Sequence, residues 1–421
     1  MTDTAGRNID EVALARTNDG TLHVLWRGRA GSTETIKHAP VSKAGAVGQV
    51  TTAVSGFNAL GNPDVAVRPD GSLQLFVGAI RSGSAGIHSA TAGAPGTTWS
   101  AASRVSTSTT PGDPGAALGA DGTPFFVWAA GTNMWAHLGP FSGGQPPEAE
   151  PSIGPTPQCC FYDPEVAVDR TSGDVYTAFY SNVSNQNGLF VQRIHPSQGP
   201  RQLAPGAVTN GDSIQPGFRT AFVARDGGGV FLAYCTGYPS CTRVVLWRVG
   251  TGSPLVVAAG TRIEDVNLAN GPDGRLWLMW QDSSKRQVFA ARTNAAATRV
   301  GAVVAVAPPP RTSTVWKLGG QGSLGPLDLL AHVSTPGSIA SWHTQVPPGL
   351  SLKCSSKKLT VTCAVTDAGS PVAGAAIKLG GKTVTTGVKG TASTSVAAGR
   401  VEATASKAGY AAATVTLRVA E

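Results

Sequence analysis

Hydrophobic and polar positions along this chain repeat one short pattern. A few apolar residues are followed by a glycine-containing turn and then by a second apolar run, which often ends near an aromatic residue. Two clear copies are "EVALARTNDGTLHVLW" and "DVAVRPDGSLQLFV". Short apolar runs on either side of an Asp-Gly type turn predict a β-hairpin. Because no stretch has the period of an amphipathic helix, the chain is predicted to be all-β.

The hairpin pattern recurs at a nearly constant interval. Further copies are "GAALGADGTPFFVW", "EVAVDRTSGDVYTAFY", "TAFVARDGGGVFLAY", "DVNLANGPDGRLWLMW" and a degenerate "KLGGQGSLGPLDLLAH". The turn glycines are Gly20, Gly71, Gly122, Gly173, Gly227, Gly274 and Gly325. With a third strand such as "LFVQRI" and a weaker fourth, each unit of about 50 residues has the size of a four-stranded propeller blade, whereas a separate sandwich needs about 100 residues. We therefore expect a seven-bladed β-propeller of four-stranded antiparallel blades over residues 1–347, with a short final blade.

One blade carries a family resemblance. The segment "PDVAVRPDGSLQLFV", followed by "GTTWSAASRVS", resembles the sialidase-like propellers with BNR repeats, whose blades have a Gly-x-Thr-Trp turn after the third strand. The resemblance covers roughly residues 9–347 and implies a propeller architecture. The turn here lacks the aspartate of the family's Asp box, and the arginine triad and Tyr–Glu pair of a catalytic sialidase are not assigned. Whether the chain is an enzyme stays open.

The pattern changes after "QVPPGLSLKCSSKKL". Residues 348–421 alternate small and β-branched residues with glycine turns and resemble a bacterial Ig-like or carboxypeptidase-regulatory-like β-sandwich, an accessory module of secreted proteins. From residue 350 onward the sequence contains nine Lys and Arg residues and three acidic residues, so this part carries +6 of the overall net charge of +8. This second domain is therefore expected either to rest on an anionic surface such as a cell wall or to be an inert basic spacer.

The cysteine count bears on the compartment. Cys235 and Cys241 flank one short turn, and Cys354 and Cys363 flank another. Together with the adjacent pair at 159–160 they account for all six cysteines, which indicates disulfides and a secreted or cell-surface protein. The N-terminus lacks a basic region followed by an apolar one, so either a signal peptide has been removed or the protein never had one; the cysteines favour removal. The sequence contains no run of eighteen apolar residues, so no transmembrane segment is predicted. It also contains no basic run interleaved with aromatic residues, so nucleic-acid binding is not expected.

Candidate binding residues gather where the first strand of each blade begins. These strands should line the axis, and the residues just before them should open onto the face where loops converge. The expected ring comprises Glu11, Asp64, Asp163, Glu165, Asp265 and Arg219. Each carboxylate has an alternative role, which is to accept hydrogen bonds from the backbone of the neighbouring blade. Crowded carboxylates repel one another unless a cation, a basic group or raised pKa values relieve them; calcium would suit such oxygen ligands, and no other cofactor is expected.

The adjacent cysteines fall at the same mouth. A disulfide between Cys159 and Cys160 would close almost no loop, so its use would be local. Beside Phe161 and Tyr162 it would offer a flat surface on which the C–H face of a sugar packs. The alternatives are a disulfide that only stiffens the turn, or two reduced thiols. On the rim, Arg81 and other loop arginines are expected either to be solvated or to contact acidic groups of a glycan.

These observations favour a carbohydrate-recognition protein that binds a glycan or polysaccharide on the loop-rich face. The first alternative is a polysaccharide-degrading enzyme on that face, either a glycoside hydrolase with two carboxylates or a lyase with a Tyr or His base. The second is a protein-binding scaffold or surface adhesin.

Overall fold

A computed structural model describes residues 1, 7–81, 83–93, 98–130, 133–139, 161–181, 187–207, 219–237 and 241–421; for 7–10 and 161–162 it describes the backbone alone. These residues form antiparallel β-sheets, with one 3-10 turn, η1 (Pro272–Gly274). No helix in these ranges is long and apolar enough to cross a membrane. The all-β prediction is therefore confirmed.

Consecutive sheets follow one another along the chain up to Val346. The first four sheets are β1 (Arg7–Arg16), β2 (Leu22–Ala30), β3 (Thr33–Val41), β4 (Thr51–Val54); β5 (Ala59–Val67), β6 (Leu73–Ile80), β7 (Gly86–Ala92), β8 (Ser103–Arg104); β9 (Pro114–Leu118), β10 (Pro124–Ala130), β11 (Asn133–Leu138); and β12 (Phe161–Val168), β13 (Val175–Ser181), β14 (Gly188–His195), β15 (Gln202–Leu203). The next three are β16 (Ala221–Ala224), β17 (Val230–Thr236), β18 (Arg243–Arg248), β19 (Leu255–Ala259); β20 (Ile263–Asn270), β21 (Leu276–Asp282), β22 (Gln287–Arg292), β23 (Val304–Val306); and β24 (Thr314–Gln321), β25 (Leu327–Thr335), β26 (Ser338–Val346).

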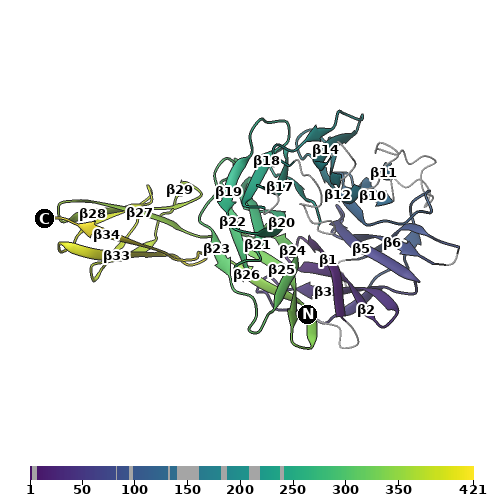
Figure 1. Ribbon diagram of the computed structural model, residues 1–421, viewed down its shortest axis with the longest axis horizontal. Helices are drawn as coiled ribbons and strands as arrows, with labels where there is room; N and C mark the ends of the chain where they lie inside the picture. Colours follow the sequence, from purple (N-terminus) through teal and green to yellow (C-terminus); the bar gives the residue numbers. More distant parts are fainter. Residues whose placement is uncertain are drawn as a thin grey trace.

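The first strands of these sheets form a closed ring. Contacts run from β1 to β5, β9, β12, β16, β20 and β24, and β24 contacts β1 again. Figure 1 shows the sheets arranged around a common centre, with the purple β1 beside the green β24. This radial arrangement is that of a β-propeller. The N-terminus also joins the last sheet, where the backbones of Met1 and Ser341 in β26 exchange hydrogen bonds of 2.6 and 2.9 Å.

The hairpin turns explain why glycine recurs. The seven turn glycines have φ between 72° and 116°, a region that side chains with a Cβ rarely adopt. Each turn closes a first strand onto a second one, so the turns gather on one face of the ring. The opposite face carries the residues that precede the first strands and the loops between second and third strands.

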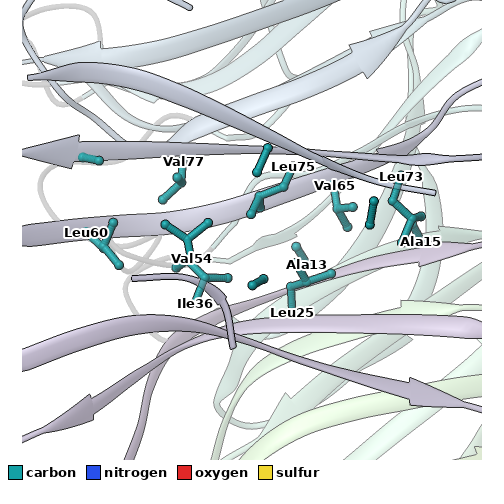
Figure 2. Packing of buried hydrophobic residues seen from close by; sticks show 14 residues of the cluster. Ala13, Ala15, Leu25, Ile36, Val54, Leu60, Val65, Leu73, Leu75 and Val77 are labelled. Atoms are coloured by element: carbon teal, nitrogen blue, oxygen red, sulfur yellow. The ribbon is translucent and has the colours of Figure 1, made fainter. Parts of the chain in front are cut away.

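Apolar side chains fill the spaces between neighbouring sheets. Figure 2 shows one such cluster, in which Leu25 and Ile36 of the first sheet face Leu73, Leu75 and Val77 of β6. All five side chains are fully buried. Because large apolar side chains bury most of their surface between sheets, the radial packing itself holds the ring together.

A β-bulge interrupts the first strand of most sheets near its loop-rich end. The register shifts between Ile9 and Val12 in β1, and equivalent shifts occur in β5, β12, β20 and β24. In three of these bulges a residue other than glycine has a positive φ, namely Asp163 (45°), Asp265 (48°) and Lys317 (57°). A bulge redirects the side chains around it, so polar residues of the first strands turn toward the axis and toward the neighbouring sheet.

The C-terminal part of the chain has a core of its own. It consists of β27 (Ser351–Lys357), β28 (Thr360–Asp367), β29 (Ser370–Pro371), β30 (Ala376–Leu379), β31 (Lys382–Thr385), β32 (Thr391–Ser395), β33 (Gly399–Ser406) and β34 (Ala413–Val419). These strands form two four-stranded sheets around a cluster that contains no residue before Leu350. In Figure 1 they project from the ring in yellow. The predicted disulfide between Cys354 and Cys363 is present and joins paired positions of β27 and β28.

A buried ion pair joins this C-terminal part to the ring. The Asp367 carboxylate pairs with the guanidinium of Arg292 and lies 3.5 Å from Nη1 of Arg275. Arg292 also packs over the Trp277 ring and donates to the Gly325 carbonyl, so it keeps partners within the ring. Buried charges of this kind are tolerated when they are paired.

Candidate functional site on the loop-rich face

Arg219 lies at the centre of the predicted acidic ring. Its guanidinium is 2.9 Å from Asp64, 3.1 Å from Glu165 and 3.3 Å from Glu11, and it donates to the Pro63 carbonyl at 2.7 Å. These carboxylates come from three different sheets, so one side chain joins sheets across the axis. The sequence predicted that a cation, a basic group or raised pKa values would relieve the crowded carboxylates. Arg219 supplies the basic group.

The pKa values of this cluster follow from its burial. Burial, followed by the charge of Asp64, raises the pKa of Glu165 to about 8 against the lowering effect of Arg219. Burial and the nearby Asp163 likewise raise the pKa of Glu11, although Arg219 and Lys317 oppose them. For Arg219 burial acts to lower the pKa, but the three carboxylates outweigh it and raise the pKa above its ordinary value. Glu165 is therefore protonated at neutral pH, which removes part of the excess negative charge.

Several of the predicted residues also form hydrogen bonds to the neighbouring sheet, which is the alternative role that the sequence left open for them. Asp64 accepts a hydrogen bond from the Ala116 N–H at 2.7 Å, and Asp265 accepts one from the Leu318 N–H at 2.6 Å. The Asp163 carbonyl accepts one from the Thr220 hydroxyl at 2.6 Å. Burial raises the pKa of Asp265 to about 7 despite the bond from Leu318. These contacts fix the spacing of neighbouring sheets, which is a structural role that does not need a ligand.

The channel beside Arg219 is narrow. A cavity of about 230 Å³ borders Asp64, Glu165 and Arg219 and continues along the first strands toward the turns. Within the described part of the chain, no group of three or more His, Cys, Asp or Glu side chains is placed to hold a metal ion.

A larger cleft lies on the same face between the sixth and seventh sheets. It has a volume of about 310 Å³. Its lining residues are Glu264, Gln281, Ser283, Arg286, Thr312, Ser313, Thr314, Val315 and Trp316. One wall is formed by the start of β20, the end of β21 and the turn after β21, and the other by the start of β24 and the two residues before it. The cleft thus combines an indole ring with carboxylate, amide, hydroxyl and guanidinium groups.

The cleft is held in place by bonds beneath and beside it. Asp265 joins β20 to β24 directly below it through its bond to Leu318. Glu264 accepts a hydrogen bond from the Ser283 hydroxyl at 2.9 Å and pairs with the exposed Arg262 at 3.1 Å. The buried Asp282 accepts bonds from the backbone and hydroxyl of Ser284 and so fixes the turn. A wall built from strands and a pinned turn presents its polar groups in a defined geometry.

Trp316 is the aromatic element of this cleft. Its side chain is half-buried, and its ring meets the buried His332 ring edge-on at a centroid distance of 6.0 Å. The contact fixes the orientation of the indole, and part of the ring surface stays accessible in the cleft. A rigid, partly exposed indole offers a flat apolar surface for a ligand.

The remaining predicted site residues are placed as follows. Cys159 and Cys160 lie outside the described residues, and for Phe161 and Tyr162 only the backbone is described, at the start of β12. Arg81 is exposed, with its guanidinium 5.1 Å from the centroid of the Phe57 ring. The predicted Cys235–Cys241 disulfide is present.

Sequence reasoning missed Trp316, Gln281 and Ser283 as members of one site. Trp316 stands immediately before the degenerate last copy of the hairpin pattern, which was recognised only from Lys317 onward. In the structure Trp316 occupies the position in β24 that Glu264 occupies in β20, because the register shifts after both residues.

Comparisons with known proteins identify solved structures that are similar to this chain. No protein-family model matches the chain, and no curated protein matches it. Similar solved structures include the hydrazine synthase of Kuenenia stuttgartiensis, with 12% identity over 82% of this chain and 97% of that chain and a TM-score of 0.49. A polysaccharide lyase has 8% identity over 80% and 90% of the two chains and a TM-score of 0.46. The α-L-arabinanase of Penicillium chrysogenum, complexed with arabinobiose, has 13% identity over 73% and 98% and a TM-score of 0.44. With TM-scores below 0.5, these likenesses assign no activity to this chain.

Proposed function

We propose that this chain is a secreted carbohydrate-recognition protein that binds a glycan in the cleft between the sixth and seventh sheets. One observation carries the proposal: the half-buried Trp316 shares a cleft of about 310 Å³ with Glu264, Gln281 and Ser283. A sugar offers an apolar C–H face to an indole ring and hydroxyl groups to carboxylate and amide oxygens. The volume is at the lower end of the range for small-ligand sites, which suits one or two sugar units.

The architecture of the proposal follows from the repeats. Seven sheets of three or four described strands and the closed ring of first strands support a seven-bladed sialidase-like propeller over residues 1–347. The separate core from Leu350 onward supports an Ig-like accessory domain over residues 348–421. Its basic charge suits an anionic surface such as a cell wall. The two disulfides support an extracellular location.

A second candidate function is hydrolysis of a glycosidic bond in the channel. Glu165, whose pKa burial raises to about 8, borders the 230 Å³ cavity beside Asp64. A protonated carboxyl beside a second carboxyl is the arrangement of a general acid and its partner. The contacts of both residues with Arg219 favour the binding function, because they occupy the oxygens that catalysis would use.

A glycan array probed with the full chain tests the proposal. We expect binding to one class of glycan, and we expect Trp316→Ala to weaken it by about tenfold, since one lost aromatic contact is worth about 0.5–1.5 kcal/mol beyond buried area. Trp342→Ala is the control, because Trp342 is a half-buried tryptophan of the same sheet outside the cleft. An array with no bound glycan, or equal loss in both variants, would contradict the proposal. A reducing-end assay with wild type and Glu165→Gln decides between binding and hydrolysis.

A further inference from the structure

The turn-bearing face of the ring contains a second cavity, which is larger than the cleft beside Trp316. It has a volume of about 530 Å³ and lies at the opposite end of the axis from Arg219. All seven hairpin turns around this mouth belong to the described residues. Its polar and charged lining is Arg16, Asn18, Arg68, Arg170, Asn270 and Gln321. The lining contains three arginines and no carboxylate.

One of these arginines is neutralised within the protein and two are not. Arg16 pairs with the buried Asp328 and donates to Gln321 at 3.1 Å. Arg68 and Arg170 have no hydrogen-bond or ion-pair partner among the described residues. They stand on the turns after β5 and β12, in sheets that are separated by one other sheet.

Nearby carboxylates are already engaged. Asp70, beside Arg68, accepts hydrogen bonds from the backbone and hydroxyl of Ser72 at 2.9 and 2.5 Å. Asp169, beside Arg170, accepts bonds from the Thr171 N–H and from the Gly229 N–H of the neighbouring sheet, at 2.8 and 2.9 Å. These bonds hold the turns and engage the carboxylates. The charge of Arg68 still helps to lower the pKa of Asp70, after the bonds from Ser72, but among the described residues neither arginine forms an ion pair with the carboxylate beside it.

An unpartnered polar group lies deeper in the same space. The side-chain carbonyl oxygen of Asn270, at the end of β20, is buried without a hydrogen-bond partner. Asn270 borders both this cavity and the narrower channel that leads to Arg219. A buried acceptor without a partner is costly to the fold, and a ligand hydroxyl would satisfy it.

We infer that this mouth is a second ligand site, which takes a hydroxylated polycarboxylate. Two guanidinium groups on non-adjacent sheets require a ligand with at least two acidic groups, and each planar fork matches a carboxylate. Asn270 accepts a hydrogen bond from a hydroxyl of that ligand. The volume of about 530 Å³ lies within the usual range for small-ligand sites. Two sources share this chemistry, a small hydroxy acid and an acidic oligosaccharide.

Titration calorimetry of the full chain, at constant ionic strength, tests the inference with citrate and digalacturonate as probes. We expect at least one of them to bind one site. Arg68→Gln and Arg170→Gln should each weaken binding about tenfold or more, because a hydrogen bond to a charged group contributes about 1.5–3 kcal/mol. Arg400→Gln, an exposed charge in the C-terminal part, should leave the affinity unchanged. The probe that binds more tightly identifies the source.

Tricarballylate, which is citrate without its hydroxyl, tests Asn270 if citrate binds: binding as tight as that of citrate would overturn the role of its side chain. No binding of either probe tighter than about 1 mM, or equal loss in Arg400→Gln, would overturn the site as a whole. Trp316→Ala should not change the affinity for either probe. The outcome is therefore independent of the glycan site on the other face.

Discussion

Replacing Arg219 with Met should destabilise the ring strongly and in a pH-dependent way. The substitution keeps much of the side-chain volume and removes the charge that contacts Glu11, Asp64 and Glu165. Breaking a buried ion pair from one side costs about 3–5 kcal/mol, because a charge is left buried without compensation. At pH 7 we expect the free energy of unfolding to fall by about this amount.

The pH dependence follows from how the carboxylates adapt. Glu165 is already protonated at pH 7, so the cost falls on a neighbouring carboxylate that Arg219 keeps ionised. That group must take up a proton to stay buried without its partner, which costs about 1 kcal/mol more for each pH unit. The loss in the Arg219→Met variant should therefore shrink by about 2 kcal/mol between pH 7 and pH 5.

Urea unfolding at both pH values, followed by tryptophan fluorescence, measures this difference. The matched control is Arg400→Met, which removes an exposed charge in the C-terminal part. A variant within about 1 kcal/mol of wild type at pH 7 would show that the Arg219 contacts do not hold the ring together. An equal loss at pH 5 and pH 7 would show that the carboxylates are not the cause.

Three further predictions concern the same ring and its junction. The stability of the wild type should fall as the pH rises from about 5 to 8.5, because folding raises the pKa of Glu165 from 4.5 to about 8 and the unfolded chain therefore releases this proton first. In urea titrations the Glu165→Gln variant should show a smaller fall. An unchanged dependence on pH in this variant would argue against the raised pKa. Gly115→Ala should lower stability by about 1–3 kcal/mol because its Cβ would overlap the Pro164 carbonyl of the next sheet, whereas Gly93→Ala, which meets nothing within 4 Å, should not. Deleting residues 350–421 should leave the calorimetric transition of the ring in place, because the C-terminal core is separate and Arg292 keeps Gly325 and Trp277 as partners; disappearance of that transition would show that the two parts fold as one.

The regular features of the fold were predictable because each repeats. The turn glycines mark every hairpin, and their positive φ values explain why the interval could be read from the sequence. The pairing of Cys235 with Cys241 and of Cys354 with Cys363 also follows from their local spacing. Both depend on contacts between residues close in the chain, which a sequence pattern records directly.

The grouping of Glu11, Asp64, Glu165 and Arg219 was predictable in kind but not in detail. Their positions at the starts of first strands indicated a shared mouth. That Arg219 would reach three carboxylates depends on the bulges and on the diameter of the ring, which no local pattern encodes. Trp316 was missed for the same reason: its partners Glu264 and Ser283 belong to another sheet and meet it only after the ring has closed. The proposed sugar platform at Cys159 and Cys160 stays a prediction from the sequence.

Hydrogen exchange measured by mass spectrometry, with and without the glycan selected on the array, tests the location of the glycan most directly. We expect the glycan to slow backbone exchange in residues 281–287 and 312–317, which form the two walls of the cleft beside Trp316. Protection confined to residues 157–166 would instead place the sugar at the adjacent cysteines. Unchanged exchange in both walls at saturating glycan would contradict the cleft as the binding site.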